Sequence, residues 1–331
     1  MKINDQTLEN NLNHALGHYL NTLTSSHELK EAYHYAVLPA GKLFRPKLVW
    51  NTFLDLAFEE AQKVLNDQKL FLKHPITKLS CAIEIHHAYT LVHDDLPSMD
   101  NDLMRRGKPS LHNKYGEWRA ILVGDGLLNM SYQILSKIDH PEALNVIKIF
   151  SHATGPKGLI EGQVLDLSHE MNLNLENLIR THELKTARLI QASLSLSALM
   201  ATHDKELSCK YWRAGYHLGV LFQLIDDLME LKDKNLTEHE IEVNPYLKYF
   251  NRTFPALLKE WKNVNDFIAE ENKTHLKDMI QNYLQKNLNE LRQEQKTILQ
   301  HIEDHHAKNS LMFNKDDQIK LEKLLNGNFV F

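Results

Sequence analysis

A helix-like apolar segment, residues 77–95, ends in an acidic run that is suited to metal chemistry: Asp94, Asp95 and, after a turn, Asp100. Adjacent carboxylates at a helix C-terminus repel each other and meet the negative end of the helix dipole, so they need a positive partner. Mg²⁺ fits, because it takes oxygen ligands and joins one or two carboxylates to substrate phosphates. Pro97 lets the chain turn so that Asp100 approaches the same region. An isolated Asp-Asp pair is more often a solvated acidic loop, and the prediction of a metal site depends on its neighbours.

Basic residues that could hold phosphate lie close to this run in the sequence. Arg105, Arg106 and Lys108 follow it directly. Arg suits bidentate phosphate binding, whereas Lys acts as a point charge. A second basic pair, Lys42 and Arg45, lies near an expected helix start, where backbone N–H groups also favour anions. That pair alone would be an ordinary solvated helix start, but acids for metal and bases for phosphate together predict a phosphorylated substrate.

A second acidic run lies within the helix-like segment 206–232. Gln223, Asp226 and Glu230 are spaced i, i+3 and i+7, which places them on one helix face, and Asp227 is adjacent to them. Such a polar stripe in apolar surroundings is costly unless its groups are paired or metal-bound. Taken alone, the stripe is as compatible with a structural role as with a metal site.

The elements that must position these residues are predicted to be helices. Glycine (12) and proline (9) are scarce in the 331 residues, and good helix formers dominate, so we predict an all-α fold. Helical periodicity covers residues 5–36, 42–57, 77–95, 117–136, 141–169, 174–202 and 206–232. The segment 233–251 is polar and irregular, and charged helical sequence follows to about residue 307. Without a visible linker we expect one domain over 1–331, with a motif-bearing core of about 40–260 and a charged helical C-terminal segment, 261–331.

Composition excludes several classes of protein. The net charge is −5, from 38 basic and 43 acidic residues, and the basic residues are dispersed, so we expect no nucleic-acid partner. No apolar run approaches the roughly 20 residues that cross a bilayer, so we expect no transmembrane segment and a cytoplasmic location. Cys81 and Cys209 cannot form a disulfide framework and are predicted to be buried small side chains.

Taken together, the motifs resemble those of the trans-prenyltransferase family, the polyprenyl and farnesyl diphosphate synthases, and in particular the bacterial farnesyl type. They occur in family order: Gly41-Lys42-Leu43-Phe44-Arg45-Pro46, the run at 94–100, Arg105-Arg106-Gly107, Gly124-Asp125, Gly162-Gln163-Val164-Leu165-Asp166-Leu167, Lys185-Thr186, and Phe222-Gln223 with Asp226-Asp227. The resemblance implies the isoprenoid synthase fold, a bundle of long helices around a central active-site cavity. It also implies that the two acidic runs face each other across the cavity mouth, and that the protein is a homodimer.

The resemblance also implies a role for each matching residue. More than one Mg²⁺ is expected on Asp94, Asp95, Asp100, Asp226, Asp227 and Glu230. Contacts with an allylic diphosphate are expected from Arg105, Lys185, Thr186 and Gln223. Contacts with isopentenyl diphosphate are expected from Lys42, Arg45, His87 and Arg106. The residues expected to be catalytic are Asp94, Asp95, Lys185 and Asp226. The implied reaction is ionisation of the allylic diphosphate, dimethylallyl or geranyl, followed by attack of isopentenyl diphosphate on the carbocation to give farnesyl diphosphate.

Product length is expected to depend on Tyr89 and Thr90. They lie five and four residues before Asp94, roughly 6 to 7.5 Å deeper along a helix. By helical angle Thr90 lies nearer the face of Asp94, so assigning the cavity floor to Tyr89 rests on the resemblance to bacterial farnesyl synthases. The spacing of Asp95 and Asp100 fits those enzymes and also some geranylgeranyl diphosphate synthases.

The sequence departs from the family pattern after Glu230, which itself replaces a third aspartate. The family's Gly-Lys-x-x-Gly-x-Asp loop is absent from residues 232–244, and Asn251-Arg252-Thr253-Phe254-Pro255 replaces its Lys-x-Thr-Tyr-Pro segment. Ala187 follows Thr186 where the family generally has glycine. A geranylgeranyl diphosphate synthase, a diverged class I terpene synthase and a noncatalytic partner subunit are therefore alternatives, as is a helical metal phosphohydrolase using His93 and Asp94.

Overall fold

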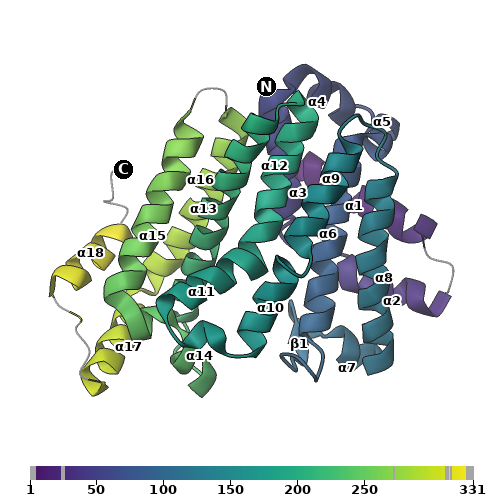
Figure 1. The fold of residues 1–331 in the computed structure, drawn as a ribbon. Coiled ribbons are helices and arrows are strands. Elements are labelled where there is room, and N and C mark those ends of the chain that lie inside the picture. The colour runs from purple at the N-terminus through teal and green to yellow at the C-terminus, as the bar shows by residue number, and fades with distance from the viewer. Residues whose placement is uncertain (1–4, 24–26, 271–272, 310–312, 314, 326–331) are drawn as a thin grey trace. The chain divides into compact units, whose positions relative to one another are not determined.

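The computed structural model describes residues 5–23, 27–270, 273–309, 313 and 315–325 (Figure 1). The chain divides into two compact units, unit 1 from Met1–His152 with Ala192–Tyr211, and unit 2 from Ala153–Gln191 with Trp212–Phe331. Each unit contains one of the two acidic runs. That residues 1–331 act as one domain stays a prediction.

Unit 1 is built from the helices of the first half of the chain. They are α1 (Asp5–Leu23), α2 (His27–Val37), α3 (Phe44–Leu56), α4 (Phe58–Leu65), α5 (Gln68–Lys73), α6 (Pro75–Asp94), α7 (Leu111–Tyr115), α8 (Glu117–Ser136) and most of α9 (Ala143–Thr154). The strands β1 (Met104–Arg105) and β2 (Lys108–Pro109) form one antiparallel hairpin, and they are the only strands in the described ranges. Helices α12 (Arg188–Thr202) and α13 (Lys205–Glu230) contribute residues to both units.

Unit 2 contains the remaining helical elements. They are α10 (Leu159–Leu167), the short turn η1 (Glu170–Asn172), α11 (Leu175–Thr181), the π-helical η2 (His182–Ala187), α14 (Glu238–Val243), α15 (Pro245–Ala269), α16 (Thr274–Gln293), α17 (Gln295–Lys308) and α18 (Lys315–Leu325). The all-α prediction is confirmed. None of the helices in the described residues is both long and apolar enough to span a bilayer.

Helix α6 is the central element of unit 1 because it is buried on nearly every side. Pro75 occupies its first turn, where a missing N–H costs nothing, and the His74 side chain accepts from the N–H of Ile76 at 3.3 Å. It packs most extensively against α8 (Figure 1). Gly124 of α8 leaves room for the ring of His93. A Cβ at Gly124 would lie 2.0 Å from the Nε2 atom of His93. The Gly124-Asp125 motif thus fixes how closely α8 approaches the helix that carries the first acidic run.

Two predictions about elements were wrong. The segment 141–169 is not one helix, because the loop at 155–158 separates α9 from α10. The segment 233–251 is largely helical rather than irregular, because it contains α14 and the start of α15. Helix α14 begins with a capping box, in which Thr237 and Glu240 each accept a hydrogen bond from the backbone N–H of the other. This capping pattern can be read in the sequence. Cys209 is also exposed, whereas Cys81 is buried as predicted.

Helix α15 contains Pro255 and is kinked at Tyr249, whose φ and ψ are −134° and 35°. Pro255 cannot donate the backbone hydrogen bond that would go to the residue four positions earlier, Asn251, which lies after the kink. The hydroxyl of Thr253 lies 3.0 Å from the carbonyl oxygen of Tyr249 and provides it with a donor. The helix therefore runs through the segment that replaces the family's Lys-x-Thr-Tyr-Pro.

Candidate active site

The first acidic run lies where α6 ends. Asp94 is the last residue of the helix and Asp95 follows as its cap. The backbone N–H of Asp100 donates to the carbonyl oxygen of Asp94 at 2.9 Å. The chain therefore folds back on the helix end, in agreement with the turn expected at Pro97.

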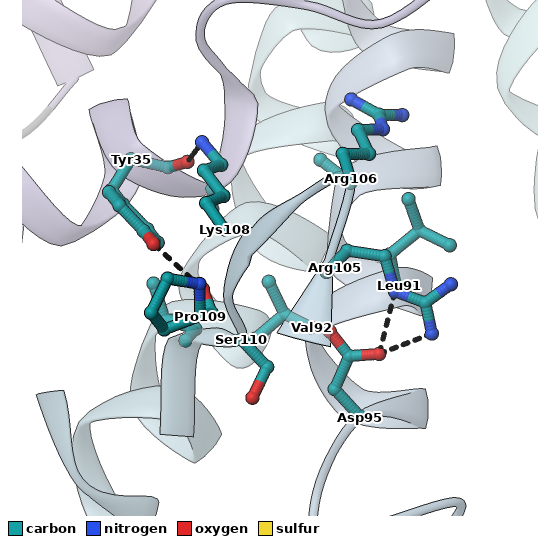
Figure 2. A pocket seen from close by; sticks show the side chains of 12 residues that line it. Tyr35, Leu91, Val92, Asp95, Arg105, Arg106, Lys108, Pro109 and Ser110 are labelled. Carbon is teal, nitrogen blue, oxygen red and sulfur yellow. Dashed lines mark hydrogen bonds and ion pairs between the residues drawn. The ribbon is translucent and has the colours of Figure 1, made fainter. Parts of the chain in front are cut away.

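Asp95 is held by Arg105. The Asp95 carboxylate is only 3% exposed, and the Nε atom of Arg105 donates to its Oδ1 atom at 2.8 Å. A second nitrogen of the guanidinium contacts the same oxygen (Figure 2). That nitrogen also lies 2.7 Å from a carboxylate oxygen of Asp102. Burial raises the pKa of Asp95, and the Arg105 charge opposes that shift. Within unit 1, Arg105 thus fixes a predicted metal ligand, and its contact with substrate stays a prediction.

The hairpin that carries these arginines has a tight two-residue turn. Arg106 and Gly107 both have positive φ, 53° and 75°, as a type I′ hairpin turn requires. The Nζ atom of Lys108 donates to the carbonyl of Tyr35 at 2.7 Å, and the Tyr35 hydroxyl donates to the carbonyl of Pro109 at 2.7 Å. These bonds attach the hairpin to α2 beside a cavity of about 40 Å³, and the Arg106 guanidinium extends away from them (Figure 2).

The predicted isopentenyl diphosphate residues come together in unit 1. Gly41 lies against the Arg106 guanidinium, because a Cβ added at Gly41 would be 2.8 Å from its Cζ atom. Burial lowers the pKa of His87 well below its usual value, and the charges of Arg45 and Arg106 lower it further. His87 is therefore neutral at physiological pH. Lys42 is exposed, and its role in binding stays a prediction.

Glu84 belongs to this cluster but was not predicted as a functional residue. Its side chain is 5% exposed, and burial raises its pKa while the charges of Arg45 and Arg106 oppose that shift. Glu84 precedes His87 by three residues and so shares its helix face, which is the signal that could have identified it. Its carboxyl group lies within electrostatic reach of both arginines.

Tyr89 belongs to an aromatic group in unit 1, and it is 8% exposed. The ring of His86 meets it edge-on at 4.6 Å between centroids, and Phe150 lies 5.0 Å beyond that ring. Thr90 instead donates its hydroxyl to the carbonyl of His87 at 2.8 Å. The bulky, buried side chain at this depth is therefore Tyr89. Its role as the floor of the cavity stays a prediction.

The second acidic run lines a separate cavity of about 170 Å³ in unit 2. Its lining residues are Asp166, Met171, Leu178, Thr181, His182, Lys185, Thr186, Gln223, Asp227, Glu230, Val243, Asn244 and Pro245. Of the three residues predicted to share one helix face, Gln223 and Glu230 line the cavity. Asp227 lines it in place of Asp226. The metal-binding role predicted for Asp226 stays a prediction.

Lys185 reaches this cavity through close contact between α10 and η2. A Cβ at Gly162 would lie 2.3 Å from the backbone nitrogen of Lys185, so only glycine permits this approach. The Lys185 ammonium forms an ion pair with the Asp166 carboxylate. Thr186 donates its hydroxyl to the Oε1 atom of Gln223 at 3.1 Å. The predicted substrate residues Lys185, Thr186 and Gln223 are thus brought together.

Glu230 has the most perturbed carboxylate of the second run. Burial and then the charge of Asp227 raise its pKa to about 7, while a hydrogen bond from Asn244 opposes the shift. The Nδ2 atom of Asn244 lies 3.3 Å from the Oε2 atom of Glu230 and 2.7 Å from the carbonyl oxygen of Asp227. Carboxylates that repel each other in this way form a site that a cation would stabilise.

The donor set fits magnesium. Nowhere in the described ranges do three His, Cys, Asp or Glu side chains form a complete metal site by themselves. Magnesium does not need such a site, because it binds through one or two carboxylates, several waters and substrate phosphates. The oxygen donors of the two runs and the like-charge repulsion at Glu230 match that requirement.

Two other side chains noted in the sequence lie outside these clusters. Arg252 is exposed and forms an ion pair with Glu176. His93 directs its Nε2 atom to the carbonyl oxygen of Ile121, 3.2 Å away.

Known proteins resemble this chain in sequence and structure. The profile of the polyprenyl synthetase family matches residues 26–242. Farnesyl diphosphate synthase of Geobacillus stearothermophilus is 36% identical over 252 residues, which cover 74% of this chain and 80% of that protein. The corresponding enzyme of Haemophilus influenzae is 35% identical over 236 residues, covering 70% and 75%. A Helicobacter pylori geranyltransferase complexed with magnesium and isoprenyl diphosphate has a TM-score of 0.67 at 28% identity, covering 86% of this chain and 100% of that one.

The chain therefore belongs to the polyprenyl synthetase family. The resemblance to the bacterial farnesyl diphosphate synthase type is confirmed. The isoprenoid synthase fold is confirmed too, since a geranyltransferase from Legionella pneumophila matches with a TM-score of 0.69 at 27% identity, over 85% of this chain and 96% of that chain. The family match ends at residue 242, near the departures noted after Glu230.

Proposed function

We propose that the protein condenses isopentenyl diphosphate with an allylic diphosphate, dimethylallyl or geranyl, to give farnesyl diphosphate. The observation that carries this proposal is the assembly in unit 1 of Arg45, His87 and Arg106 beside the acidic run on α6. A class I terpene synthase has no use for a second diphosphate site, so this cluster favours chain elongation. The curated relatives that are named farnesyl diphosphate synthase support the same reaction.

The carboxylate oxygens of both acidic runs would hold Mg²⁺. When bound, the metal would supply the positive charge that lets the allylic C–O bond ionise. Asp94 and Asp95 hold that charge at the end of α6, and Asp227 and Glu230 hold it in unit 2. Lys185 offers a fixed ammonium to the same diphosphate after exchanging its Asp166 partner. The number of ions and the approach of the two runs to each other stay predictions.

The second substrate is held by unit 1. Arg45 and Arg106 bind its diphosphate by bidentate hydrogen bonds, and neutral His87 donates a hydrogen bond without adding charge. The double bond of isopentenyl diphosphate is thereby positioned to attack the allylic carbocation. Apolar side chains of α6, among them Ala88 and Val92, exclude water that would quench the cation. Loss of a proton from the product completes the step, and the released diphosphate accepts it.

The test is incubation of the purified protein with geranyl and isopentenyl diphosphates and Mg²⁺, followed by hydrolysis and sizing of the products. We expect the fifteen-carbon alcohol. A twenty-carbon product would instead assign the chain to the geranylgeranyl type. Absence of any product from a well-folded sample would identify a noncatalytic subunit and refute the proposal.

Homodimer formation and a cytoplasmic location are part of the same proposal. The first rests on the family resemblance, and the second rests on the sequence, in which no apolar run approaches the length that crosses a bilayer. Light scattering coupled to size-exclusion chromatography tests the first, with an expected mass of twice 38.5 kDa. A mass of one chain at micromolar concentration would contradict it.

A further inference from the structure

His182 is a buried polar side chain of unit 2 that the mechanism above does not use. It is 6% exposed, and its Nε2 atom lies 2.9 Å from the Oδ2 atom of Asp227. An ionised carboxylate can only accept hydrogen bonds, so the Nε2 atom of His182 carries the proton and donates it. The pair joins two residues that lie 45 positions apart in the sequence.

The other oxygen of Asp227 is held as well. The Nε2 atom of Gln223 lies 3.3 Å from the Oδ1 atom, and the Oε1 atom of Gln223 in turn accepts the hydrogen bond from Thr186. Asp227 is 6% exposed, and a buried carboxylate is costly unless donors surround it. His182 and Gln223 therefore hold the carboxylate from both sides, so it cannot rotate freely.

The π-helical segment η2 explains how His182 reaches this position. A π-helix holds more residues in each turn than an α-helix, and such turns often occur at functional sites. His182 begins η2, and Lys185 and Thr186, further along it, line the same cavity. One irregular turn thus presents a lysine, a hydroxyl and an imidazole to the second acidic run.

We infer that His182 is a positioning residue, which fixes the Asp227 carboxylate so that its remaining lone pairs are aimed for binding the magnesium-diphosphate group. This inference rests on the proposed function. A carboxylate has about four lone-pair sites, and the donors from His182 and Gln223 occupy two. Partners that orient a ligand from behind typically contribute about 10-fold to 100-fold in metal affinity or activity.

Two variants separate the hydrogen bond from the packing of the ring. His182→Phe keeps a flat ring but loses the donor, whereas His182→Gln keeps an N–H donor at the reach of Nε2. His152→Phe, at an exposed histidine of unit 1, is the matched control. Circular dichroism melting checks that each variant folds.

The first readout is the binding of Mn²⁺ in the presence of inorganic pyrophosphate. It is measured from the electron paramagnetic resonance signal of free Mn²⁺ and needs no turnover. We expect His182→Phe to weaken Mn²⁺ binding by about 10-fold or more, while His182→Gln and the control stay within a few-fold of wild type. In turnover assays the KM for isopentenyl diphosphate should stay unchanged in His182→Phe while the Mg²⁺ concentration for half-maximal rate rises. Equal Mn²⁺ binding by wild type and His182→Phe, or equal losses in both His182 variants, would overturn the inference. Wild type that binds no Mn²⁺ with pyrophosphate would overturn the proposed function, and the inference with it.

A second measurement applies even where His182→Phe does not fold. In wild-type protein with ¹⁵N-labelled histidine, the His182 ring should be protonated at Nε2, with the proton protected from exchange by the buried bond to Asp227. The opposite tautomer, protonated at Nδ1 alone, would refute the donor role.

Discussion

Replacing Tyr89 with alanine should lengthen the product. Tyr89 is the bulky side chain about 7.5 Å below Asp94 along α6, and it is buried against His86. If the growing chain stops at this ring, removing the ring opens the cavity to the next obstacle. That obstacle is the His86 ring, which Ser131 holds through a contact of 3.1 Å between Nδ1 and Oγ.

The expected increase follows from the spacing of the two rings. The ring centroids of Tyr89 and His86 are 4.6 Å apart, and three residues of helix rise by about 4.5 Å. The added depth is one layer of side chains, so we expect growth by a single five-carbon unit, from fifteen to twenty carbons. Loss of a buried aromatic ring also costs up to about 4 kcal/mol of folding free energy.

The assay sizes the products of Tyr89→Ala beside those of two controls. Tyr89→Phe keeps the ring and should give wild-type products, and so should Thr90→Ala, because the Thr90 hydroxyl bonds to its own helix. Melting by circular dichroism shows whether Tyr89→Ala is folded. Fifteen-carbon products from a folded Tyr89→Ala variant would refute the floor. Products much longer than twenty carbons would refute His86 as the next obstacle.

Three further changes test the carboxylates and the close contacts. Glu230→Gln should stabilise the metal-free protein at pH 8 by at most about 3 kcal/mol and should have no effect at pH 4. Burial raises the pKa of Glu230 from 4.5 to about 7. The wild type therefore loses stability as the pH rises from about 4.5 to about 7. Thermal melting at both pH values measures this effect, and an equal shift at both would contradict the cause. In Gly41→Ala the added Cβ would lie 2.8 Å from the Arg106 guanidinium and should displace it. Steady-state assays should show a higher KM for isopentenyl diphosphate and an unchanged KM for the allylic substrate. An unchanged KM for isopentenyl diphosphate would exclude Arg106 from the isopentenyl diphosphate site. Gly162→Ala would place its Cβ 2.3 Å from a backbone nitrogen of η2 and should lower the melting temperature by several degrees, whereas an unchanged melting temperature would show that α10 can move away.

The parts of the site that the sequence could predict are those set by short spacings. The run at 94–100 needs only a helix end and a proline turn. Groups three or four residues apart on a helix share a face whatever the tertiary fold, so the polar stripe around Gln223 was also visible.

Contacts between distant segments could not be predicted in this way. The pair of His182 and Asp227 depends on an irregular helical turn meeting α13, and periodicity assigns no partner to either residue. In the sequence, Glu84 is one more position of the helix that carries the first acidic run. Its interaction with Arg45 and Arg106 depends on how two other segments fold against that helix. The helical content of 233–251 is a different case, because the capping box at Thr237 can be read in the sequence even though the composition of the segment is polar.

The central claim is that the acidic run on α6 catalyses magnesium-dependent prenyl transfer. Release of inorganic diphosphate from geranyl and isopentenyl diphosphates tests it most directly, for wild type and for Asp94→Ala, with Mg²⁺ and with excess chelator. We predict one diphosphate for each coupling in the wild type, none with chelator, and a loss of several orders of magnitude in Asp94→Ala. Undiminished release in Asp94→Ala, or release that persists with chelator, would contradict the claim.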